Sequence, residues 1–286
     1  MWALRSLILL LLSFLPSPSR SSSWKAAWKG PVFVLFPGLG LKSSDYDAFL
    51  SGYEVACGPE ELFPLTKDGV DRMGPPGTPA FDRWFAETKA TYDQLLDDLE
   101  DVPVIMFGHS AGIMMATACA LKQRKNIAAL VTFGGAPWAE NRDNLPCPTL
   151  ALCGTEDGIA LSRFQAVAEK VPPPRSGRRR SSTLSTLPVE YSLVQGADHY
   201  AVVSEEGARR SIALNAAIRG EEDAQPDESV SSLRRSSSEA QRHMDDIHAK
   251  IIAFLGRLSY SGGNDDGGVG FALGFGTLLD VLSSWF

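Results

Sequence analysis

The sequence predicts an α/β protein with a mostly parallel central sheet and helices on both faces of that sheet. Short apolar segments typical of buried strands alternate along the chain with longer segments typical of helices. The strand-like segments are residues 31–36, 103–107, 127–133, 148–153 and 189–194. The length of 286 residues, of which 44% are hydrophobic and 21% are charged, is enough to bury one substantial core.

Two amphipathic segments predict helices that cover the sheet. Residues 81–99 place apolar side chains on one helical face and charged side chains on the other, so we expect this helix to pack on the sheet just before the strand at 103–107. Residues 243–258 repeat the pattern and predict a closing helix. The residues interpreted as core in the first helix are Phe81, Trp84, Phe85, Tyr92, Leu95, Leu96 and Leu99.

A sharp strand-to-helix turn is predicted at residues 108–112, where the sequence is Gly-His-Ser-Ala-Gly. The segment 103–107 before it is rich in strand formers, and the segment 113–121 after it has the composition of a buried helix. Such a turn needs its two glycines, because side chains there would collide with neighbouring backbone. It also exposes the Ser110 hydroxyl, as expected of a nucleophile elbow. An ordinary glycine-rich loop is the alternative, which the flanking strand and helix disfavour.

An acidic residue and a histidine follow Ser110 in the order that nucleophilic catalysis by serine uses in this kind of fold. The strand-like segment 148–153 ends in Gly-Thr-Glu-Asp. We expect Asp157 to be the acid, because the carboxylate normally lies three positions after the strand-ending glycine, and Glu156 is the competing choice. The last strand-like segment runs into His199, which is the expected base.

The other three histidines of the chain are given structural roles. His109 lies inside the turn, and we expect its ring to pack underneath it. His243 and His248 fall in the late amphipathic helix, where we expect them on the solvent-facing side. By elimination, His199 is left as the base.

The expected chemistry follows from the weakness of a serine hydroxyl as a nucleophile. A base must take the proton of Ser110 during attack on a carbonyl group and return it to the leaving group, while the acid orients that base. The resulting oxyanion needs hydrogen-bond donors, and the backbone N–H of Ala111 is the first one expected.

The second oxyanion donor is expected in the loop at residues 37–40, which follows the apolar segment 31–36. The sequence leaves open whether Leu39 or Gly40 supplies this N–H group. A tight turn without a catalytic role is the alternative.

The elbow at Ser110, the later Asp157 and His199, and the glycine-rich loop 37–40 together resemble the α/β-hydrolase superfamily over residues 30–258. Within it the chain is most similar to lid-poor branches such as dienelactone hydrolase, platelet-activating-factor acetylhydrolase and cutinase-like esterases. The resemblance implies hydrolysis of a small-molecule carboxylic ester through an acyl-serine intermediate, with no cofactor and no metal. The alternatives are a thioesterase or amidase with the same residues, and a non-catalytic binding protein on the same scaffold.

Several segments lie between or beside these elements. The link at 134–147 is too short for a helical lid, so an open site is expected; Trp138 in this link is a candidate for lining an acyl pocket, with ordinary packing as the alternative. Residues 173–187, rich in arginine and serine, and residues 219–242, acidic and then rich in serine, are predicted to be disordered insertions.

The two ends of the chain are interpreted outside the fold. Residues 1–23 are predicted to be a secretory signal peptide, because a basic residue precedes an apolar run too short to span a bilayer. This predicts a secreted protein or one of the secretory pathway, with a bipartite organelle signal as the alternative. Residues 259–286 form a glycine-rich linker and an apolar tail. Such a tail could lie on a membrane or on a partner, and we favour no membrane contact.

Charge and cysteine content exclude two further classes. The formal net charge of −7 argues against a nucleic-acid partner, whose phosphates require a basic surface. The chain has four cysteines, and Cys147 and Cys153 bracket one strand at a separation too large to bridge. A dense disulfide framework is therefore excluded.

Overall fold

The computed structural model describes residues 31–122, 124–142, 144–170, 189–221 and 236–260. The predicted signal peptide, the insertion at 173–187, most of the insertion at 219–242 and the tail from residue 261 lie outside the described residues.

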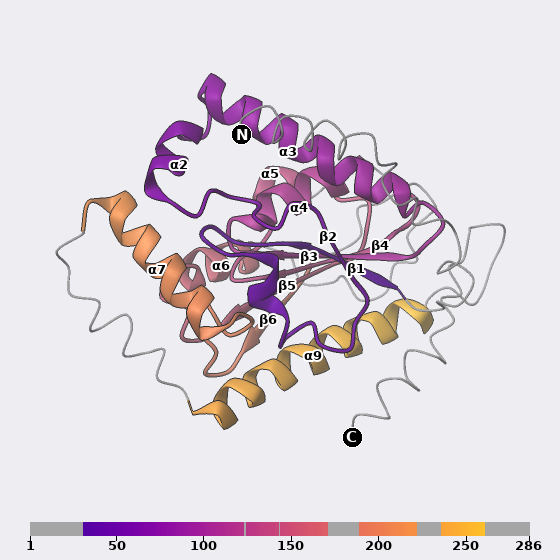
Figure 1. Cartoon of the computed structure of the whole chain (residues 1–286). Helices are drawn as coiled ribbons and strands as arrows, with labels where there is room; N and C mark the ends of the chain where they lie inside the picture. The colour runs from indigo at the N-terminus through magenta and orange to yellow at the C-terminus, as the bar shows by residue number, and fades with distance from the viewer. Residues whose placement is uncertain (1–30, 123, 143, 171–188, 222–235, 261–286) are drawn as a thin grey trace, which may run out of the picture. The chain divides into compact units, whose positions relative to one another are not determined.

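The described residues contain one six-stranded sheet in which every strand is parallel to its neighbours (Figure 1). The predicted α/β class with a mostly parallel sheet is therefore confirmed. The short edge strand was not predicted, because an apolar run of three residues that is largely accessible to solvent is too short to indicate a strand. In spatial order the strands are β2 (Val55–Cys57), β1 (Val32–Phe36), β3 (Val104–His109), β4 (Ile127–Phe133), β5 (Thr149–Gly154) and β6 (Val189–Val194).

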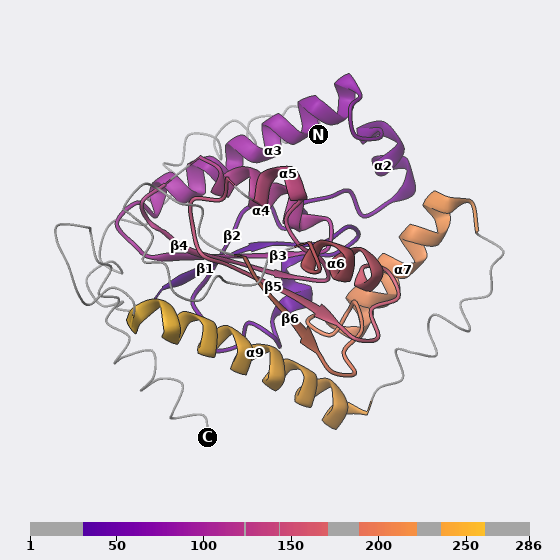
Figure 2. The same cartoon turned by 180° about the vertical axis from the view of Figure 1, so that it is seen from behind.

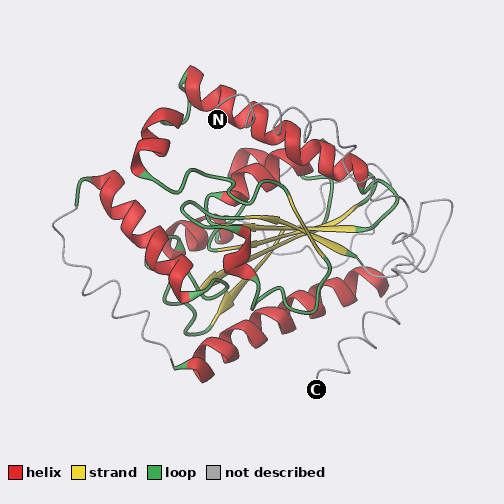
Figure 3. Cartoon of the chain, viewed as in Figure 1, coloured by secondary structure: helices red, strands yellow, loops and turns green. Residues whose placement is uncertain are grey.

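Helices cover both faces of this sheet. Figures 1 and 2 agree that α3 and α4 lie on one side and α9 on the other, and Figure 3 shows the strands enclosed between these layers. The central strands are buried on both faces, which explains why they are continuous apolar runs rather than alternating ones. The helices are η1 (Ser43–Tyr46), α2 (Lys67–Met73), α3 (Pro79–Asp98), α4 (Gly112–Ala120), α5 (Ala139–Arg142), α6 (Leu161–Ala168), α7 (Glu205–Arg219) and α9 (Ser237–Tyr260).

The second half of α3 packs on the sheet as predicted, and the first half does not. Tyr92 is fully buried, stacks on the ring of Phe36 at 4.3 Å between centroids, and donates a hydrogen bond to the Leu35 carbonyl. Trp84 and Phe85, predicted to be core, are only half-buried. Their half of the helix contacts α2 and the Phe63 ring instead, so an amphipathic pattern along 20 residues overstated the length of helix that covers the sheet.

Helix α9 corrects two predictions. It begins at Ser237, so residues 237–242 belong to the helix and not to an insertion, and it continues to Tyr260. Its histidines do not face solvent: His243 is 5% exposed, and His248 stacks on Phe49 and donates to that residue's carbonyl oxygen at 2.8 Å. Burial lowers the pKa of His248, and a neutral imidazole can then occupy a buried face that charged residues avoid.

Two further features of the described residues concern the cysteines and the helices. All four cysteines are free, including the buried Cys147 and Cys153. None of the described helices combines the length and the apolar character needed to cross a bilayer.

The start of α4 lies against the backbone at the end of β1. A Cβ atom on Gly112 would lie 2.1 Å from the carbonyl oxygen of Phe36 and 2.6 Å from that of Pro37. No side chain can occupy that space, so the second elbow glycine is required by backbone packing, as its position in the sequence predicts.

We therefore expect Gly112→Ala to lower the free energy of unfolding by about 2 kcal/mol or more, because rigid backbone would have to move. The matched control is Gly256→Ala in α9, where a Cβ would meet nothing within 4 Å. That change should raise the free energy of unfolding by about 0.5–1 kcal/mol through helix propensity. Urea unfolding of both variants measures the difference, and equal effects would contradict the packing argument.

Candidate active site

Ser110 occupies a strained turn between β3 and α4. Its φ angle is +52°, and it is the one non-glycine residue with positive φ in the described parts of the chain. Its backbone N–H donates to the carbonyl oxygen of Phe133 at the end of β4, which helps to hold this conformation. A Cβ on Gly108 would lie 3.0 Å from the Cα of Ile113, so the first elbow glycine is also closely packed. The predicted strand-to-helix turn is thus present, and it presents the serine hydroxyl.

The structure brings the three predicted side chains into one hydrogen-bonded chain. His199 Nε2 lies 2.8 Å from Ser110 Oγ, and His199 Nδ1 lies 2.8 Å from Asp157 Oδ2. Because a carboxylate only accepts, Nδ1 carries a hydrogen, and in the neutral imidazole Nε2 accepts from the serine hydroxyl. The three residues follow β3, β5 and β6, whose carboxyl ends meet at one edge of the sheet.

Asp157 is held in place by more than the histidine. Its Oδ1 atom accepts hydrogen bonds from the backbone N–H groups of Ile159 at 2.9 Å and Ala160 at 2.7 Å. Burial alone would raise the pKa of this carboxyl, but the hydrogen bond and charge of His199 and the two backbone donors outweigh it, so the pKa is lowered. The competing Glu156 is exposed, and Asp157 is the carboxylate placed against the imidazole.

The loop at residues 37–40 lies beside the serine. A Cβ on Gly38 would lie 3.2 Å from Ser110 Cβ, and the loop closes as a turn in which Leu41 N–H donates to the Gly38 carbonyl. The carbonyl oxygens of the two candidate donor residues point toward α7: Ser211 Oγ donates to that of Leu39 at 2.7 Å, and Arg210 Nε donates to that of Gly40 at 3.1 Å.

The Leu39 carbonyl shares its trans peptide group with the N–H of Gly40, so that N–H points away from Ser211. Within the described residues, the backbone N–H groups of Leu39, Gly40 and Ala111 donate to no protein acceptor. These contacts do not decide between Leu39 and Gly40 as the second donor, and both stay predictions, as does Ala111 as the first donor.

Residues that the sequence did not single out fix this loop. Buried Asp45 of η1 accepts from the backbone N–H of Lys42 at 2.7 Å and from Ser204 Oγ at 3.1 Å, and it forms an ion pair with Arg210. The ion pair joins η1 to α7, and α7 holds the loop carbonyls. No sequence pattern could reveal these partners, because Asp45 and Arg210 are 165 residues apart.

The strand order, the serine elbow and the following acid and histidine decide the architecture. The chain has the α/β-hydrolase fold. In the described residues, the connection between β4 and β5 contains one short helix, the four-residue α5, which is too small to form a lid. Among these residues there is also no group of histidine, cysteine and acidic side chains that could hold a metal ion.

No protein-family model matches the chain, and no curated protein matches it. Among solved structures, it is similar to a dienelactone hydrolase from Anabaena variabilis, with a TM-score of 0.42 and 17% identity, covering 68% of this chain and 84% of that one. It is also similar to Est1E from Butyrivibrio proteoclasticus, with a TM-score of 0.39 and 13% identity, covering 70% of this chain and 92% of that one. A third similar structure is MGS-MChE2, an α/β-hydrolase enzyme from a sediment metagenome of the Mar Chica lagoon. Its TM-score is 0.42 and its identity 14%, covering 67% of this chain and 92% of that one. The α/β-hydrolase fold is assigned from this chain's own sheet order and elbow.

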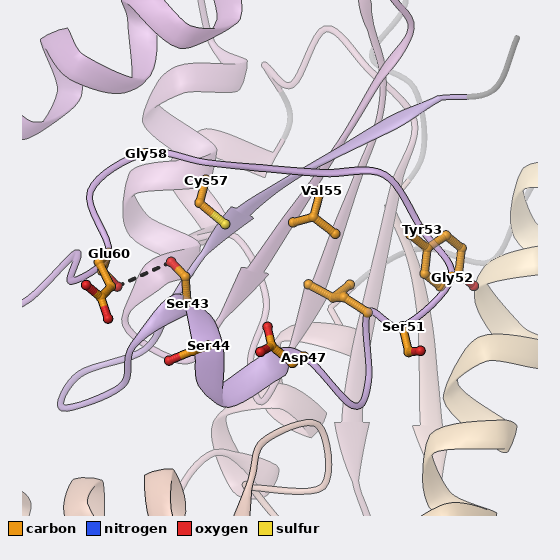
Figure 4. Close-up of a pocket in the computed structure, with 11 residues that line it drawn as sticks. Ser43, Ser44, Asp47, Ser51, Gly52, Tyr53, Val55, Cys57, Gly58 and Glu60 are labelled. Carbon is orange, nitrogen blue, oxygen red and sulfur yellow. Dashed lines mark hydrogen bonds between the residues drawn. The ribbon is translucent and has the colours of Figure 1, made fainter. Parts of the chain in front are cut away.

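A separate surface hollow lies between η1 and the edge strand β2 (Figure 4). It has a volume of about 610 Å³ and is lined by Leu50, Tyr53 and Val55 together with polar side chains, one of which, Ser43, donates to the Glu60 carbonyl. None of the predicted site residues lines it.

The lowered pKa of Asp157 predicts an acid-dependent contribution to folding. A carboxyl whose folded pKa lies below its unfolded value of about 3.9 stabilises the fold fully above that value and loses the contribution as pH falls through the folded pKa. The difference in unfolding free energy between the unmodified chain and Asp157→Asn should therefore shrink between pH 5 and pH 3. Chemical unfolding at each pH measures it, and exposed Glu156→Gln is the control. If the difference in unfolding free energy stayed constant from pH 5 to pH 3, the lowered pKa of Asp157 would be contradicted.

Proposed function

We propose that this chain is a serine hydrolase that cleaves carboxylic esters through an acyl-Ser110 intermediate. The observation that carries the proposal is the continuous chain of 2.8 Å contacts from Ser110 through His199 to Asp157, with the serine at a positive-φ elbow. These contacts support the proposed roles of Ser110 as nucleophile, His199 as base and Asp157 as orienting acid.

In the proposed reaction, Ser110 Oγ attacks the ester carbonyl carbon while His199 Nε2 takes the serine proton. The carbonyl oxygen becomes an oxyanion, which accepts hydrogen bonds from the N–H of Ala111 and from that of Leu39 or Gly40. The protonated imidazole then gives its proton to the departing alkoxide, leaving an acyl-serine. A water molecule then attacks the acyl carbon while His199 Nε2 takes a proton from it, and the imidazolium gives that proton to Ser110 Oγ as the carboxylic acid leaves.

Asp157 acts on the base. It accepts from His199 Nδ1 and stabilises the imidazolium that forms during each attack. Because both oxygens of Asp157 already accept hydrogen bonds and its pKa is lowered, the carboxyl stays ionised at neutral pH.

The surroundings of the site favour a substrate with an apolar part. Trp138 and Ile159 are 55% and 58% exposed, and they lie in the loops that follow β4 and β5 at the edge where the triad lies. Because ligand sites are lined predominantly by apolar side chains, we propose that these two residues contact the apolar part of the substrate. A soluble or amphiphilic ester fits this combination.

The proposal is tested with p-nitrophenyl esters of graded chain length and with a fluorophosphonate probe that modifies activated serines. Turnover together with labelling at Ser110 supports an esterase. Turnover of thioester or anilide substrates in preference to esters would replace it by a thioesterase or amidase, and absence of both turnover and labelling would indicate a binding protein on a hydrolase scaffold.

Replacing the nucleophile should remove nearly all activity. We expect Ser110→Ala to lower kcat on the order of 10⁶-fold, because no covalent intermediate can form, while the melting temperature stays close to that of the unmodified chain. Steady-state kinetics and thermal unfolding of the same preparation check this. Retention of more than a small fraction of turnover would exclude Ser110 as the nucleophile.

The two neighbouring acids should differ sharply. Asp157→Asn is expected to lower kcat by about 10⁴-fold, because an amide favours the wrong imidazole tautomer. Glu156→Gln, one residue away and exposed, should leave kcat within about twofold, as surface substitutions away from a site usually have little effect. If the two variants lost activity equally, Asp157 would not be the acid.

A further inference from the structure

Tyr46 and His109 form a buried polar pair that the proposed reaction does not use directly. Both side chains are fully buried. Tyr46 Oη lies 2.8 Å from His109 Nδ1, and Gly38 N–H donates to the same Oη atom at 3.0 Å. On the other side of the ring, His109 Nε2 lies 2.8 Å from the backbone carbonyl oxygen of His199. The prediction that His109 packs under the turn is confirmed, but its partners show more than packing.

These contacts determine the direction of each hydrogen bond. A carbonyl oxygen only accepts, so His109 Nε2 must carry the hydrogen that it donates to His199. Burial, together with the nearby His199 ring, lowers the pKa of His109 to about 3, so the ring is neutral and Nδ1 is an acceptor. Tyr46 therefore donates to Nδ1, and its oxygen accepts from Gly38. Each polar atom of the two side chains thus has a hydrogen-bond partner, and only one assignment of donors and acceptors satisfies all three contacts.

The pair joins three parts of the candidate site. Gly38 directly precedes the candidate oxyanion donor Leu39, and His109 directly precedes Ser110. The accepting carbonyl belongs to His199 itself. The hydrogen-bonded chain therefore runs from the end of β1, across the end of β3, to the loop after β6. These are the segments whose relative positions set the distances between nucleophile, base and oxyanion donors.

A neutral ring suits this position. The ring centroids of His109 and His199 are 5.2 Å apart. A positive charge on His109 would oppose the protonation of His199 that the reaction requires. An uncharged hydrogen-bonded link can hold the base without that repulsion.

We propose that Tyr46 and His109 are positioning residues that hold the loop 37–40 and His199 in register with Ser110. The inference rests on the proposed function, because the role is a role in that reaction. Neither side chain touches a reacting atom, so the effect is geometric: a displacement of about 1 Å costs on the order of 100-fold in rate. Proton transfer and oxyanion binding act in the transition state, so kcat rather than KM should fall.

The test compares two tyrosines in the same kind of environment. Tyr46→Phe removes one hydroxyl and keeps the ring. Tyr92→Phe is the matched control, because Tyr92 is also fully buried and its hydroxyl donates to Leu35 of β1, which is not one of the site residues. With p-nitrophenyl butyrate, Tyr46→Phe should lower kcat by about 10–100-fold with KM within about threefold. Tyr92→Phe should keep kcat within about twofold, although both variants lower the melting temperature.

A second pair of variants tests the histidine. The carboxamide of His109→Gln can accept from Tyr46 and donate to His199, whereas His109→Leu can do neither. We expect the Gln variant to retain at least tenfold more kcat than the Leu variant. Equal kcat in the Gln and Leu variants, or equal losses in Tyr46→Phe and Tyr92→Phe, would overturn the positioning role.

Imidazole nitrogen NMR of the unmodified chain gives a readout independent of activity. His109 should be neutral at pH 7 with its hydrogen on Nε2, and a hydrogen on Nδ1 would refute the hydrogen-bond direction on which the inference depends. The two proposals fail separately. An unmodified chain that neither hydrolyses esters nor reacts with the fluorophosphonate refutes the proposed function, while an active chain in which Tyr46→Phe behaves like Tyr92→Phe refutes only the positioning role.

Discussion

The approach of α4 to the end of β1 is the constraint on which the site depends. With no space for a side chain at Gly112, the helix begins directly against the carbonyl groups of Phe36 and Pro37. The chain must then turn from β3 into α4 within two residues, and Ser110 takes a positive φ that costs about 1–3 kcal/mol. The same contact brings the N-terminus of α4 beside the loop 37–40, as the proposed binding of an oxyanion by both requires.

Four ionisable side chains are buried in and beside the candidate site. Asp45, His109, Asp157 and His199 are each less than 9% exposed. Each has partners that offset its desolvation: backbone N–H groups and a cation for the two carboxylates, and carbonyl, hydroxyl or carboxylate groups for the two rings. Such networks lose stability sharply when one member is removed, so the same hydrogen bonds that fix the geometry also make it intolerant of substitution.

Most of the sheet could be predicted from the sequence because buried parallel strands are short apolar runs with clear ends. Ser110, Asp157 and His199 were found for a related reason: each follows such a run, and strand ends in a parallel sheet gather at one edge. The edge strand β2 is not predictable in this way, because three residues are too few to show the alternation or the continuous burial that indicates a strand. His248 is turned inward although its polarity predicts exposure, because the Phe49 carbonyl, 199 residues away in the sequence, accepts a hydrogen bond from its ring.

The supporting residues were missed for a different reason. Tyr46 and Arg210 act on groups of the site through tertiary contacts, and nothing in their local sequence distinguishes them from an ordinary core aromatic and a surface cation. Sequence patterns reveal what a residue can do chemically and which element it belongs to. They do not reveal which distant backbone group it meets.

The contacts that complete the site are among the most non-local in the molecule, and this bears on the order of folding. Ser110 and His199 are 89 residues apart, and the two hydrogen bonds from α7 to the loop 37–40 span 170 and 172 residues. Closing such long loops is slow, because chain entropy is lost before the contact is gained. The chain can therefore pair neighbouring strands early and still lack the assembled site, whose loop 37–40 is held only after α7 has docked.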